Sequence, residues 1–525
     1  MRGYSQGMRA TSLGHAGILV DTLDGSIVCD PWFLPQFHGS WFVFPRNDQL
    51  STALMQRICH PTYLFISHIH ADHLDEGWLL EHMDKDTTVL VPGYPTRELE
   101  GILRRLGFHS IVRTVDGEEM RLGPHLTVAI HCETSITDGP GGDSAIVISD
   151  GTGRLVNQND CRTNDLAALR SHGPVDLHWL QYSGAIWYPM VYDEPPQRMR
   201  ELVDAKVDSQ YSRALRYVEA VGATAVVPSA GPPAFLDPEL FQFNVITGDE
   251  LSIFPDQRGF MSRLADAGHR GILAIPGTTI EFSAGTSEMQ VEHPLPDNEV
   301  DAIFSDKAAY LRDYQSDWMP WLEQLKASWL PPSDDLLERL AAWWEPLMAM
   351  APTVCDAIGD TVVLHAGDLP VALDFRARRV RRWAGEDHGF RFTVQRELVE
   401  TVVAQRAVDW SNSLFLSCRF SAWRKGQYNE YVYNFFKSLS VERMRRTEAE
   451  AVRKLQPDHG GAAEEDIRIG DWIVQRTCPH RKADLSVFGE IDDGELVCTL
   501  HGWRFDLATG VCRNADDRPL RVRRA

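Results

Sequence analysis

Four residues near the C-terminus have the types and spacing to bind an iron–sulfur cluster. They form two cysteine–histidine pairs, C-P-H at 478–480 and C-T-L-H at 498–501, separated by 17 residues. A [2Fe–2S] cluster with mixed ligands takes two thiolates on one iron and two imidazoles on the other. Because each pair offers one sulfur and one nitrogen, two loops could clamp such a cluster between them. The sequence therefore predicts Cys478, His480, Cys498 and His501 as its ligands.

A structural zinc site is the alternative for these four residues. Zinc fingers, however, place two cysteines in one pair and two histidines in the other. The residues that follow, Gly502-Trp503-Arg504-Phe505-Asp506, resemble the Rieske domains of oxygenases, and the resemblance implies a Rieske cluster. Respiratory Rieske proteins carry extra cysteines where this chain has Arg481 and Thr499. We therefore expect a reduction potential near the lower end of the Rieske range, at about −150 mV.

A second group of potential metal ligands lies in the sequence S-H-I-H-A-D-H at 67–73. In an extended segment His68 and His70 point to the same side. A turn into the helical pattern that follows would bring Asp72 and His73 towards them. Burying three histidines and an aspartate together is costly without a cation. We expect one or two metal ions here, and these ligand types suit zinc and iron alike.

The motif matches the HxHxDH pattern of the metallo-β-lactamase superfamily without a gap, and the resemblance covers roughly residues 11–290. Leu13-Gly14-His15-Ala16-Gly17 and Asp30-Pro31-Trp32 also look like that superfamily's first strands. The resemblance implies two metal sites with an aspartate shared between them. Their implied ligands, which are also the implied catalytic residues, are His68, His70 and His131 in site one, Asp72 and His73 in site two, and Asp160 in both.

The chain departs from this superfamily at the last metal ligand. The superfamily usually places a histidine after a late strand, but the strand expected at 223–228 is followed by Ser229-Ala230-Gly231. Site two could therefore be weak, empty, or completed by water or substrate, and Glu133 is a substitute ligand for either site. His15 and His178 are expected to be structural.

Strands and helices must alternate along the N-terminal half to position these residues. Strands are expected at 17–21, 26–30, 62–66, 126–130 and 145–148, and helices at 75–82 and 196–207. This pattern indicates an α/β multidomain protein, and the resemblance implies an αββα metallo-β-lactamase-like sandwich over residues 1–295. Residues 296–445 read as an α+β middle domain, with helices at 301–328 and 333–350. Residues 446–525, after a linker at 456–465, read as an all-β Rieske domain.

Composition limits the environment and the partners. The net charge of −22 argues against nucleic-acid binding, which requires a basic face. No run of 18 apolar residues exists, so we expect no membrane span. Nine cysteines without a signal peptide indicate reduced thiols and metal ligands in the cytoplasm. A basic run at 376–382 is expected to be a solvated strand edge, with phosphate or acidic-partner binding as the alternative.

The two metal motifs together indicate an oxygenase. Zinc has no redox chemistry, so a one-electron donor on the same chain favours non-heme iron, one ion or two, in the N-terminal site. The segments at 181–193 and 229–236, and the pairing of Gly142-Asp143-Ser144-Ala145 with Asn157-Gln158-Asn159-Asp160, resemble the CMP-N-acetylneuraminate hydroxylase family. That family has its Rieske domain at the N-terminus, whereas here it is at the C-terminus. The resemblance implies a hydroxylase of a nucleotide sugar or a natural-product intermediate.

Such an enzyme needs a small-molecule substrate, O2 and an external electron donor such as a ferredoxin or a reductase. A homo-oligomer is compatible with the sequence, which defines neither the substrate nor the middle domain's role. Two other functions use the same motifs. One is a zinc-dependent hydrolase with a redox-sensing Rieske domain. The other is an O2 or NO reductase resembling flavo-diiron proteins.

Overall fold

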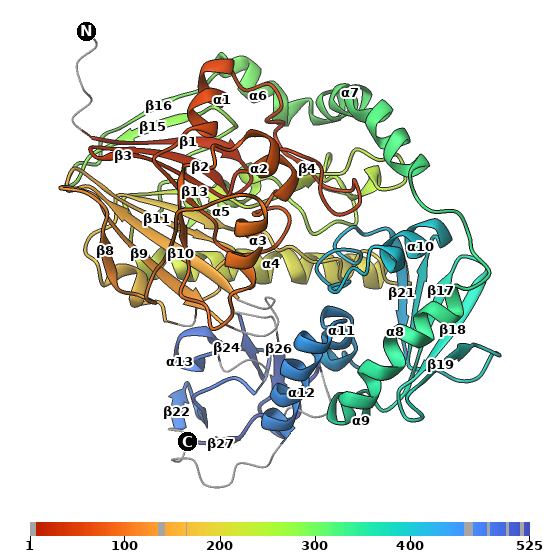
Figure 1. Ribbon diagram of the computed structural model, residues 1–525. Helices are drawn as coiled ribbons and strands as arrows, with labels where there is room; N and C mark the ends of the chain where they lie inside the picture. The colour runs from red at the N-terminus through yellow and green to blue at the C-terminus, as the bar shows by residue number, and fades with distance from the viewer. Residues whose placement is uncertain are drawn as a thin grey trace. The chain divides into compact units, whose positions relative to one another are not determined.

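A computed structural model describes residues 7–134, 142–163, 165–455, 466–479, 483–499, 503–514 and 519–525. The predicted linker at 456–465 and the ligands His480 and His501 lie outside the described residues. The chain divides into two compact units (Figure 1). Unit one comprises Met1–Ala185 and Gln210–Pro320, and unit two comprises Ile186–Ser209 and Trp321–Ala525.

Unit one is built on two sheets. The eight-stranded sheet has the order β16-β15-β1-β2-β3-β5-β6-β7, and the six-stranded sheet has the order β13-β12-β11-β10-β9-β8. The strands of the first are β1 (Met8–Gly14), β2 (Gly17–Thr22), β3 (Gly25–Cys29), β5 (Tyr63–Phe65), β6 (Thr88–Val91), β7 (Ile111–Arg113), β15 (Thr279–Phe282) and β16 (Met289–Glu292). Those of the second are β8 (Glu119–Arg121), β9 (Thr127–Glu133), β10 (Asp143–Ser149), β11 (Arg154–Asn159), β12 (Leu177–Gln181) and β13 (Ala225–Ser229). A separate two-stranded ribbon joins β4 (Phe42–Val43) and β14 (Pro233–Ala234).

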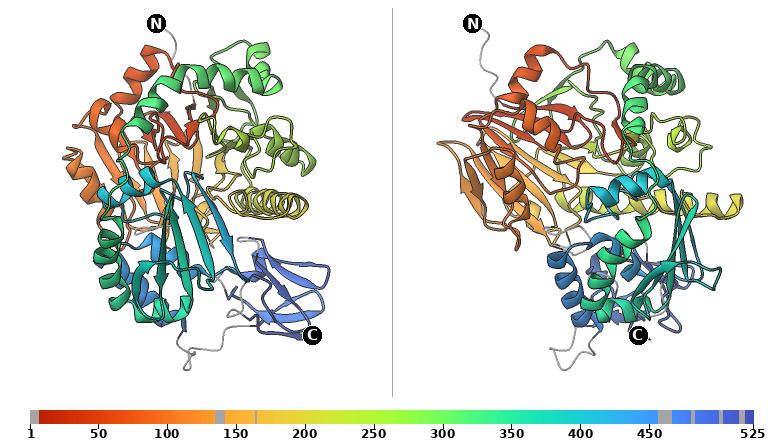
Figure 2. Two further views of the ribbon diagram at one scale, coloured as in Figure 1. Left: turned by 90° about the vertical axis from the view of Figure 1, so that its right-hand side faces the viewer. Right: turned by 45° about the vertical axis from the view of Figure 1, so that its right-hand side comes forward.

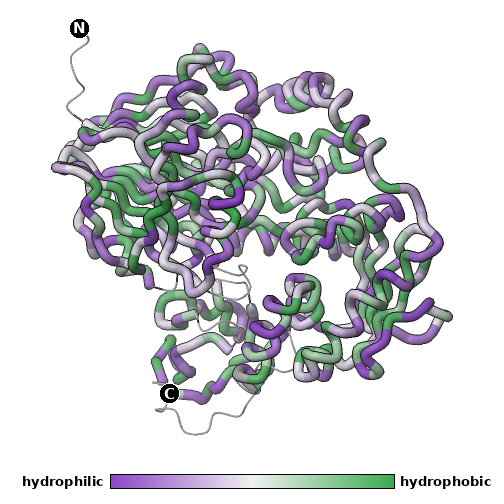
Figure 3. Tube along the Cα trace, in the orientation of Figure 1, coloured by the Kyte–Doolittle hydropathy of each residue, from purple (hydrophilic) through white to green (hydrophobic). Residues whose placement is uncertain are grey.

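The two sheets pack face to face through one apolar core. Ile18 and Ile27 from the first sheet share this core with Ile130, Ile146 and Trp179 from the second. Side chains alternate along a strand, so each strand sends every second residue into this layer. Figure 3 shows the resulting hydrophobic stretches in the strands of the sandwich.

Helices cover the outer faces of both sheets. On the first sheet, Ile58, Trp78 and Leu103 pack against strand residues such as Leu64; they belong to α1 (Thr52–Cys59), α2 (Glu76–His82) and α3 (Glu98–Arg105). On the second sheet, Val221 at the end of α4 (Pro196–Val221) packs in one apolar cluster with strand residues such as Ala145. Figure 2 shows α4 as one continuous helix. The predicted αββα sandwich is confirmed.

The end of this unit differs from the predicted boundary at residue 295. The helix α6 (Asp297–Ser305) and most of α7 (Lys307–Ala327) belong to unit one, which ends at Pro320. Aromatic packing explains the difference. The rings of Phe304 and Tyr310 lie 5.8 and 6.0 Å from that of Phe44, and the Tyr310 hydroxyl accepts a 3.0 Å hydrogen bond from the Arg46 amide.

Unit two contains a five-stranded sheet of order β19-β18-β17-β20-β21. Its strands are β17 (Thr361–Ala366), β18 (Leu369–Asp374), β19 (Arg379–Arg382), β20 (Phe390–Val394) and β21 (Phe420–Arg424). Its helices are α8 (Leu336–Met350), α9 (Pro352–Ile358), α10 (Arg396–Ala404), α11 (Glu430–Lys437) and α12 (Val441–Leu455). The basic run thus ends in β19, an edge strand with exposed arginines, as the solvated-edge interpretation predicts.

Residues 186–209 belong to unit two rather than to the sandwich that precedes them in the sequence. The Trp187 ring packs 5.5 Å from Phe415 and 5.7 Å from Tyr433, and the Tyr192 hydroxyl contacts the Tyr433 hydroxyl. The Arg424 guanidinium lies over the Tyr192 ring. The aromatic residues of this segment therefore form part of the packed interior of unit two.

The C-terminal part of unit two consists of two three-stranded sheets and one helical turn. The sheets have the orders β22-β23-β27 and β24-β25-β26. Their elements are β22 (Asp466–Ile469), β23 (Trp472–Gln475), α13 (Leu485–Phe488), β24 (Gly489–Asp492), β25 (Glu495–Cys498), β26 (Trp503–Asp506) and β27 (Val522–Arg524). Among the described residues, no helix combines the length and apolar character needed to cross a membrane.

Candidate metal centre

The loop after β5 gathers histidines at one end of the sandwich. The His73 and Leu74 amides donate hydrogen bonds of 3.0 and 2.8 Å to the His70 carbonyl, which turns the chain towards α2. His68 Nε2 lies 2.8 Å from His70 Nδ1 and 3.2 Å from Asp143 Oδ1. Ligand atoms of His68, His70 and Asp143 thus converge closely enough to hold one metal ion.

A buried aspartate and serine fix the orientation of two of these histidines. Asp30 is fully buried, and its carboxylate accepts hydrogen bonds from the Ser67 amide at 2.8 Å and the Ser67 hydroxyl at 2.6 Å. The same carboxylate lies 3.0 Å from His73 Nδ1, and the Ser67 oxygen lies 2.9 Å from His68 Nδ1. Both Nδ1 atoms therefore act as donors, which leaves the Nε2 lone pairs for a metal. Partners of this kind orient metal-binding histidines in many proteins.

His73 Nε2 belongs to a second convergent group. It lies 3.5 Å from Asp160 Oδ1 and 3.8 Å from Asp72 Oδ2, and His15 Nε2 lies 3.0 Å from Asp72 Oδ2. Within the described part of the chain, the buried atoms His73 Nε2 and Asp160 Oδ1 have no hydrogen-bond partner. His15, Asp72 and His73 could hold one ion, and His68, His73 and Asp160 connect the two groups.

The protonation states fit a bound cation. Burial, with the neighbouring His73 and His70, lowers the pKa of His68 well below its usual value, so His68 is neutral. Burial opposes charge on His73, but Asp160 and Asp72 outweigh it and raise the His73 pKa. Burial acts against ionisation of Asp72 as well, but His73 and His15 hold its pKa below the usual range. A buried set of carboxylates and lone pairs facing one another is what a cation would satisfy.

The structure differs from the expected ligand set at His131. Its Nε2 lies 2.9 Å from His172 Nε2, and it belongs to none of the three convergent groups. Val128 and Ile130 of β9 point into the core between the sheets, whereas Ala129 and therefore His131 are on the opposite face, where His131 lies beside His172. Asp143, at the start of β10, lies where a third ligand of His68 and His70 was expected.

The sequence predicts a structural role for His15, but the structure brings it to the second group. It lies between β1 and β2, which pair with each other, and its carbonyl accepts a 3.0 Å hydrogen bond from the Ala230 amide. Ala230 belongs to the Ser229-Ala230-Gly231 segment after β13, where the last histidine of the superfamily was expected. The only sequence signal for His15 is the Leu13-Gly14-His15-Ala16-Gly17 match. Glu133, the suggested substitute ligand, lies opposite Asp143 in the β9–β10 pair.

Two of the predicted Rieske ligands, Cys478 and Cys498, are among the described residues. Both are buried, and each lies at or after the end of a strand. Cys498 is the last residue of β25, and Cys478 follows β23, with its amide donating a 2.8 Å hydrogen bond to the Ala483 carbonyl. The Thr499 hydroxyl donates to the Phe488 carbonyl at 3.1 Å, so it does not donate to a cluster. The expected low potential stays a prediction, which a redox titration tests.

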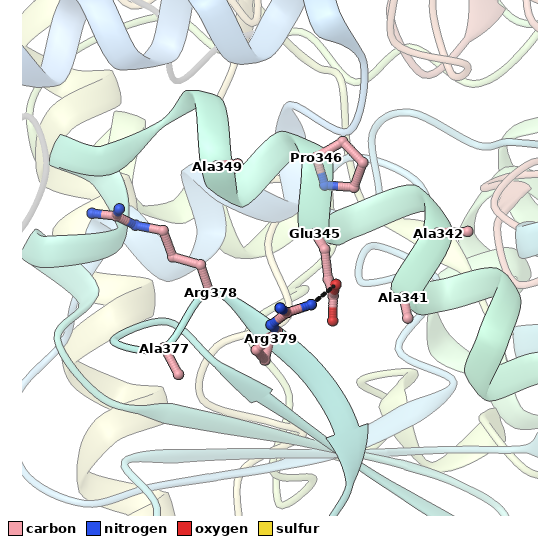
Figure 4. A pocket seen from close by; sticks show the side chains of 8 residues that line it. All are labelled: Ala341, Ala342, Glu345, Pro346, Ala349, Ala377, Arg378 and Arg379. Carbon is pink, nitrogen blue, oxygen red and sulfur yellow. Dashed lines mark hydrogen bonds and ion pairs between the residues drawn. The ribbon is translucent and has the colours of Figure 1, made fainter.

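A surface groove elsewhere in the molecule carries different chemistry. It is bordered by one face of α8, the turn before β19 and the first residue of β19 (Figure 4). Arg379 points towards Glu345 and donates a 2.9 Å hydrogen bond to it. Four of the eight lining residues are alanines, so we assign no chemistry to this groove.

Comparisons with known proteins identify two of the three parts. Residues 466–522 match the model of the Rieske [2Fe-2S] domain, which confirms the C-terminal prediction. Residues 336–453 match the model described as Rv3818-like, SCP2-like domain. The sequence motifs predicted an α+β domain here but not this similarity. Residues 336–453 are therefore similar to a domain that is found in Rv3818-like proteins.

Two solved structures match about half of this chain, and the likeness is weak. CmlA, a diiron beta-hydroxylase from Streptomyces venezuelae, is 18% identical over 53% of this chain and 54% of its own, with a TM-score of 0.34. Igni18, a metallo hydrolase from Ignicoccus hospitalis, is 18% identical over 53% of this chain and 98% of its own, with a TM-score of 0.35.

Relatives of full length are much more similar. Rv3818 of Mycobacterium tuberculosis, a candidate Rieske 2Fe-2S iron–sulfur protein, is 44% identical over 98% of this chain and 100% of its own length. A relative of the same description in Mycolicibacterium smegmatis is 42% identical over the same shares. The chain belongs to this family of Rieske 2Fe-2S iron–sulfur proteins.

Proposed function

We propose that this protein is a non-heme iron oxygenase in which the Rieske cluster supplies electrons to one or two irons in the N-terminal sandwich. One observation carries the proposal: a Rieske domain and a buried histidine–aspartate centre occur on the same chain. The ligand types of that centre suit zinc as well as iron. A one-electron donor, however, needs a redox-active acceptor, and zinc has no redox chemistry.

In this proposal His68, His70 and Asp143 hold one metal position, and His15, Asp72 and His73 hold the other, with Asp160 beside both. Bound iron would supply the reduction of O2 that oxidises the substrate. The protein supplies geometry. Asp30 and Ser67 keep the Nδ1 protons of His73 and His68 in place, so that both Nε2 atoms remain free to coordinate.

The reaction requires three partners from outside the chain. These are O2, an organic small-molecule substrate, and an electron donor such as a ferredoxin or a reductase that reduces the Rieske cluster. The protein is proposed to act in the cytoplasm, where low-molecular-weight reductants keep its nine cysteines as thiols.

Metal analysis of the purified full-length protein tests the proposal. We expect iron beyond the two atoms of the Rieske cluster, and a Cys478→Ser variant that loses the cluster spectrum while keeping this additional iron. A His68→Ala variant should show the reverse. If the wild-type protein carries zinc and only cluster iron, the oxygenase proposal fails and a zinc hydrolase becomes the better interpretation.

A further inference from the structure

A second polar cluster lies beside Asp160, and the metal centre does not use it. It is formed by Arg162, just after Asp160, and by Gln210 and Arg213 of α4. Gln210 and Arg213 are 1% and 4% exposed. Residues three apart on a helix share a face, so both side chains point to the same side of α4.

Contacts on that face fix where α4 lies. Tyr217, one turn beyond Arg213, donates a 2.9 Å hydrogen bond from its hydroxyl to the Thr163 carbonyl. This contact holds the buried face of α4 against the loop that follows Asp160. Gln210 and Arg162 both lie next to Gly184. A Cβ atom added to Gly184 would be 2.7 Å from Gln210 Nε2 and 3.7 Å from Arg162 Nη2.

Three buried polar atoms of this cluster, on Gln210 and Arg213, lack hydrogen-bond partners within the described residues. Neither the Gln210 amide oxygen nor its nitrogen has a hydrogen-bond partner, and Arg213 Nη2 has none. A buried guanidinium nitrogen without an acceptor is unfavourable, and a bound anion would supply the acceptor that is missing.

The charges around Arg213 are of both signs. Arg213 interacts with the like charge of Arg162, and burial together with Arg162 lowers its pKa to about 9. Asp160 is the carboxylate that acts on Arg213, and it already faces His73 in the metal centre, whereas Glu133 acts on the neighbouring Tyr217. Two arginines therefore lie at the edge of the metal site.

We propose that Arg162, Gln210 and Arg213 bind a carboxylate or phosphate group of the substrate and so place its reactive carbon beside the metal centre. Arginine binds both oxyanions through charge-assisted hydrogen bonds. The Gln210 amide donates a further hydrogen bond. The role in substrate binding rests on the proposed oxygenase function, whereas the anion site itself does not.

Thermal unfolding of the full-length protein with added anions tests this. The probes are inorganic phosphate and acetate, each compared with sodium chloride at equal ionic strength. A ligand that binds only the native state raises the unfolding midpoint in a concentration-dependent way. We expect this for at least one probe. The more effective probe indicates whether the substrate is a phosphate or a carboxylic acid.

Two variants and one control locate the effect. Arg213→Met should weaken the apparent anion affinity at least about tenfold, whereas an anion bound by the metals alone would persist in this variant. Gln210→Glu places a carboxylate beside the arginines, so it should raise the midpoint without anion and remove the anion dependence. Arg198→Met, on an exposed part of α4 where Arg198 pairs with Glu201, should behave as wild type.

Three outcomes overturn the inference: no anion dependence in the wild-type protein, unchanged dependence in Arg213→Met, or a Gln210→Glu variant that is less stable and still binds anions. If Arg213→Met does not fold, Gln210→Glu decides. Metal analysis separates this result from the proposed function. Anion dependence without additional iron contradicts the oxygenase, and additional iron without anion dependence contradicts only the anion site.

Discussion

Two buried polar clusters, one in each unit, differ in how completely they are satisfied. In unit two, Glu400 of α10 is 1% exposed and accepts hydrogen bonds from the Ser333 amide at 2.9 Å and from Arg396 Nε at 3.0 Å. The Ser333 hydroxyl and Arg339 also donate to it. Burial acts against ionisation of Glu400, but Ser333 and Arg396 outweigh it and lower its pKa.

The histidine cluster of unit one has the opposite character. His68 Nε2 and His70 Nδ1 face each other at 2.8 Å, and acceptors such as Asp143 and Asp160 face ring nitrogens rather than a fixed cation. Both clusters are buried, but only the Glu400 cluster supplies arginines to its carboxylate. A satisfied network holds a fold together, whereas an unsatisfied one indicates a site that binds something else.

The largest effect is expected from removing His68, a ligand of one metal position that also belongs to the group connecting the two positions. His68→Ala should lower the metal affinity and the oxidation rate more than about a hundredfold, above the ~10–100-fold effect of losing a ligand's supporting partner. The measurements are metal content and product formation. His68 is buried, so the metal content is compared with the stability of the metal-free variant, which separates loss of the ligand from unfolding. Unchanged metal content would contradict the proposed centre.

Breaking the satisfied network should affect stability instead. Glu400→Ala removes the buried carboxylate that Arg396 and Arg339 share, while Arg396 keeps Asp368 and Arg339 keeps Asp335, so we expect a loss of roughly 1.5–3 kcal/mol in the free energy of unfolding of unit two. Denaturant titration measures it, and metal content should stay at the wild-type value. Glu397→Ala on the same helix is the matched control, with a change within about 0.5 kcal/mol. Equal losses of unfolding free energy in Glu400→Ala and Glu397→Ala would contradict a stabilising role of the Glu400 network.

His15 tests how far the unsatisfied cluster extends. If His15 is a ligand or orients Asp72, His15→Ala should weaken the binding of one metal ion about 10–100-fold. Cobalt(II) titration followed by absorption spectroscopy measures this. His178→Ala is the control, because His178 is also buried but lies 2.9 Å from Gln158 Oε1, outside the centre. An identical cobalt spectrum and affinity in His15→Ala would return His15 to a structural role.

The smallest effect concerns pH. Asp160 and Asp72 raise the His73 pKa against the opposing effect of burial, so the metal-free protein holds a proton that a metal must displace. Cobalt(II) affinity should therefore fall as the pH drops below the raised His73 pKa, by up to about tenfold per pH unit. In the metal-free protein the stabilisation from charged His73 is present at low pH and is lost as the pH rises through that pKa. Affinity that increases on acidification would contradict this assignment.

Short-range patterns were enough to predict much of this protein. The spacing of the 68–73 motif predicts convergent ligands because a strand end and a turn place them together locally. The strands at 17–21, 26–30 and 145–148 and the helix at 75–82 follow from alternation and helical periodicity, and each occurs in the structure. The cysteine–histidine spacing identified the Rieske domain, which the family match confirms.

Tertiary structure alone decided which distant residues complete the centre. Asp143 and His15 come from other strands and turns, and His131 lies beside His172, because strand pairing and packing set which side chains reach the loop. The same holds for residues 186–209, whose aromatic rings pack in unit two although their sequence neighbours belong to unit one. Such contacts depend on packing between segments far apart in the chain, and no local spacing encodes them.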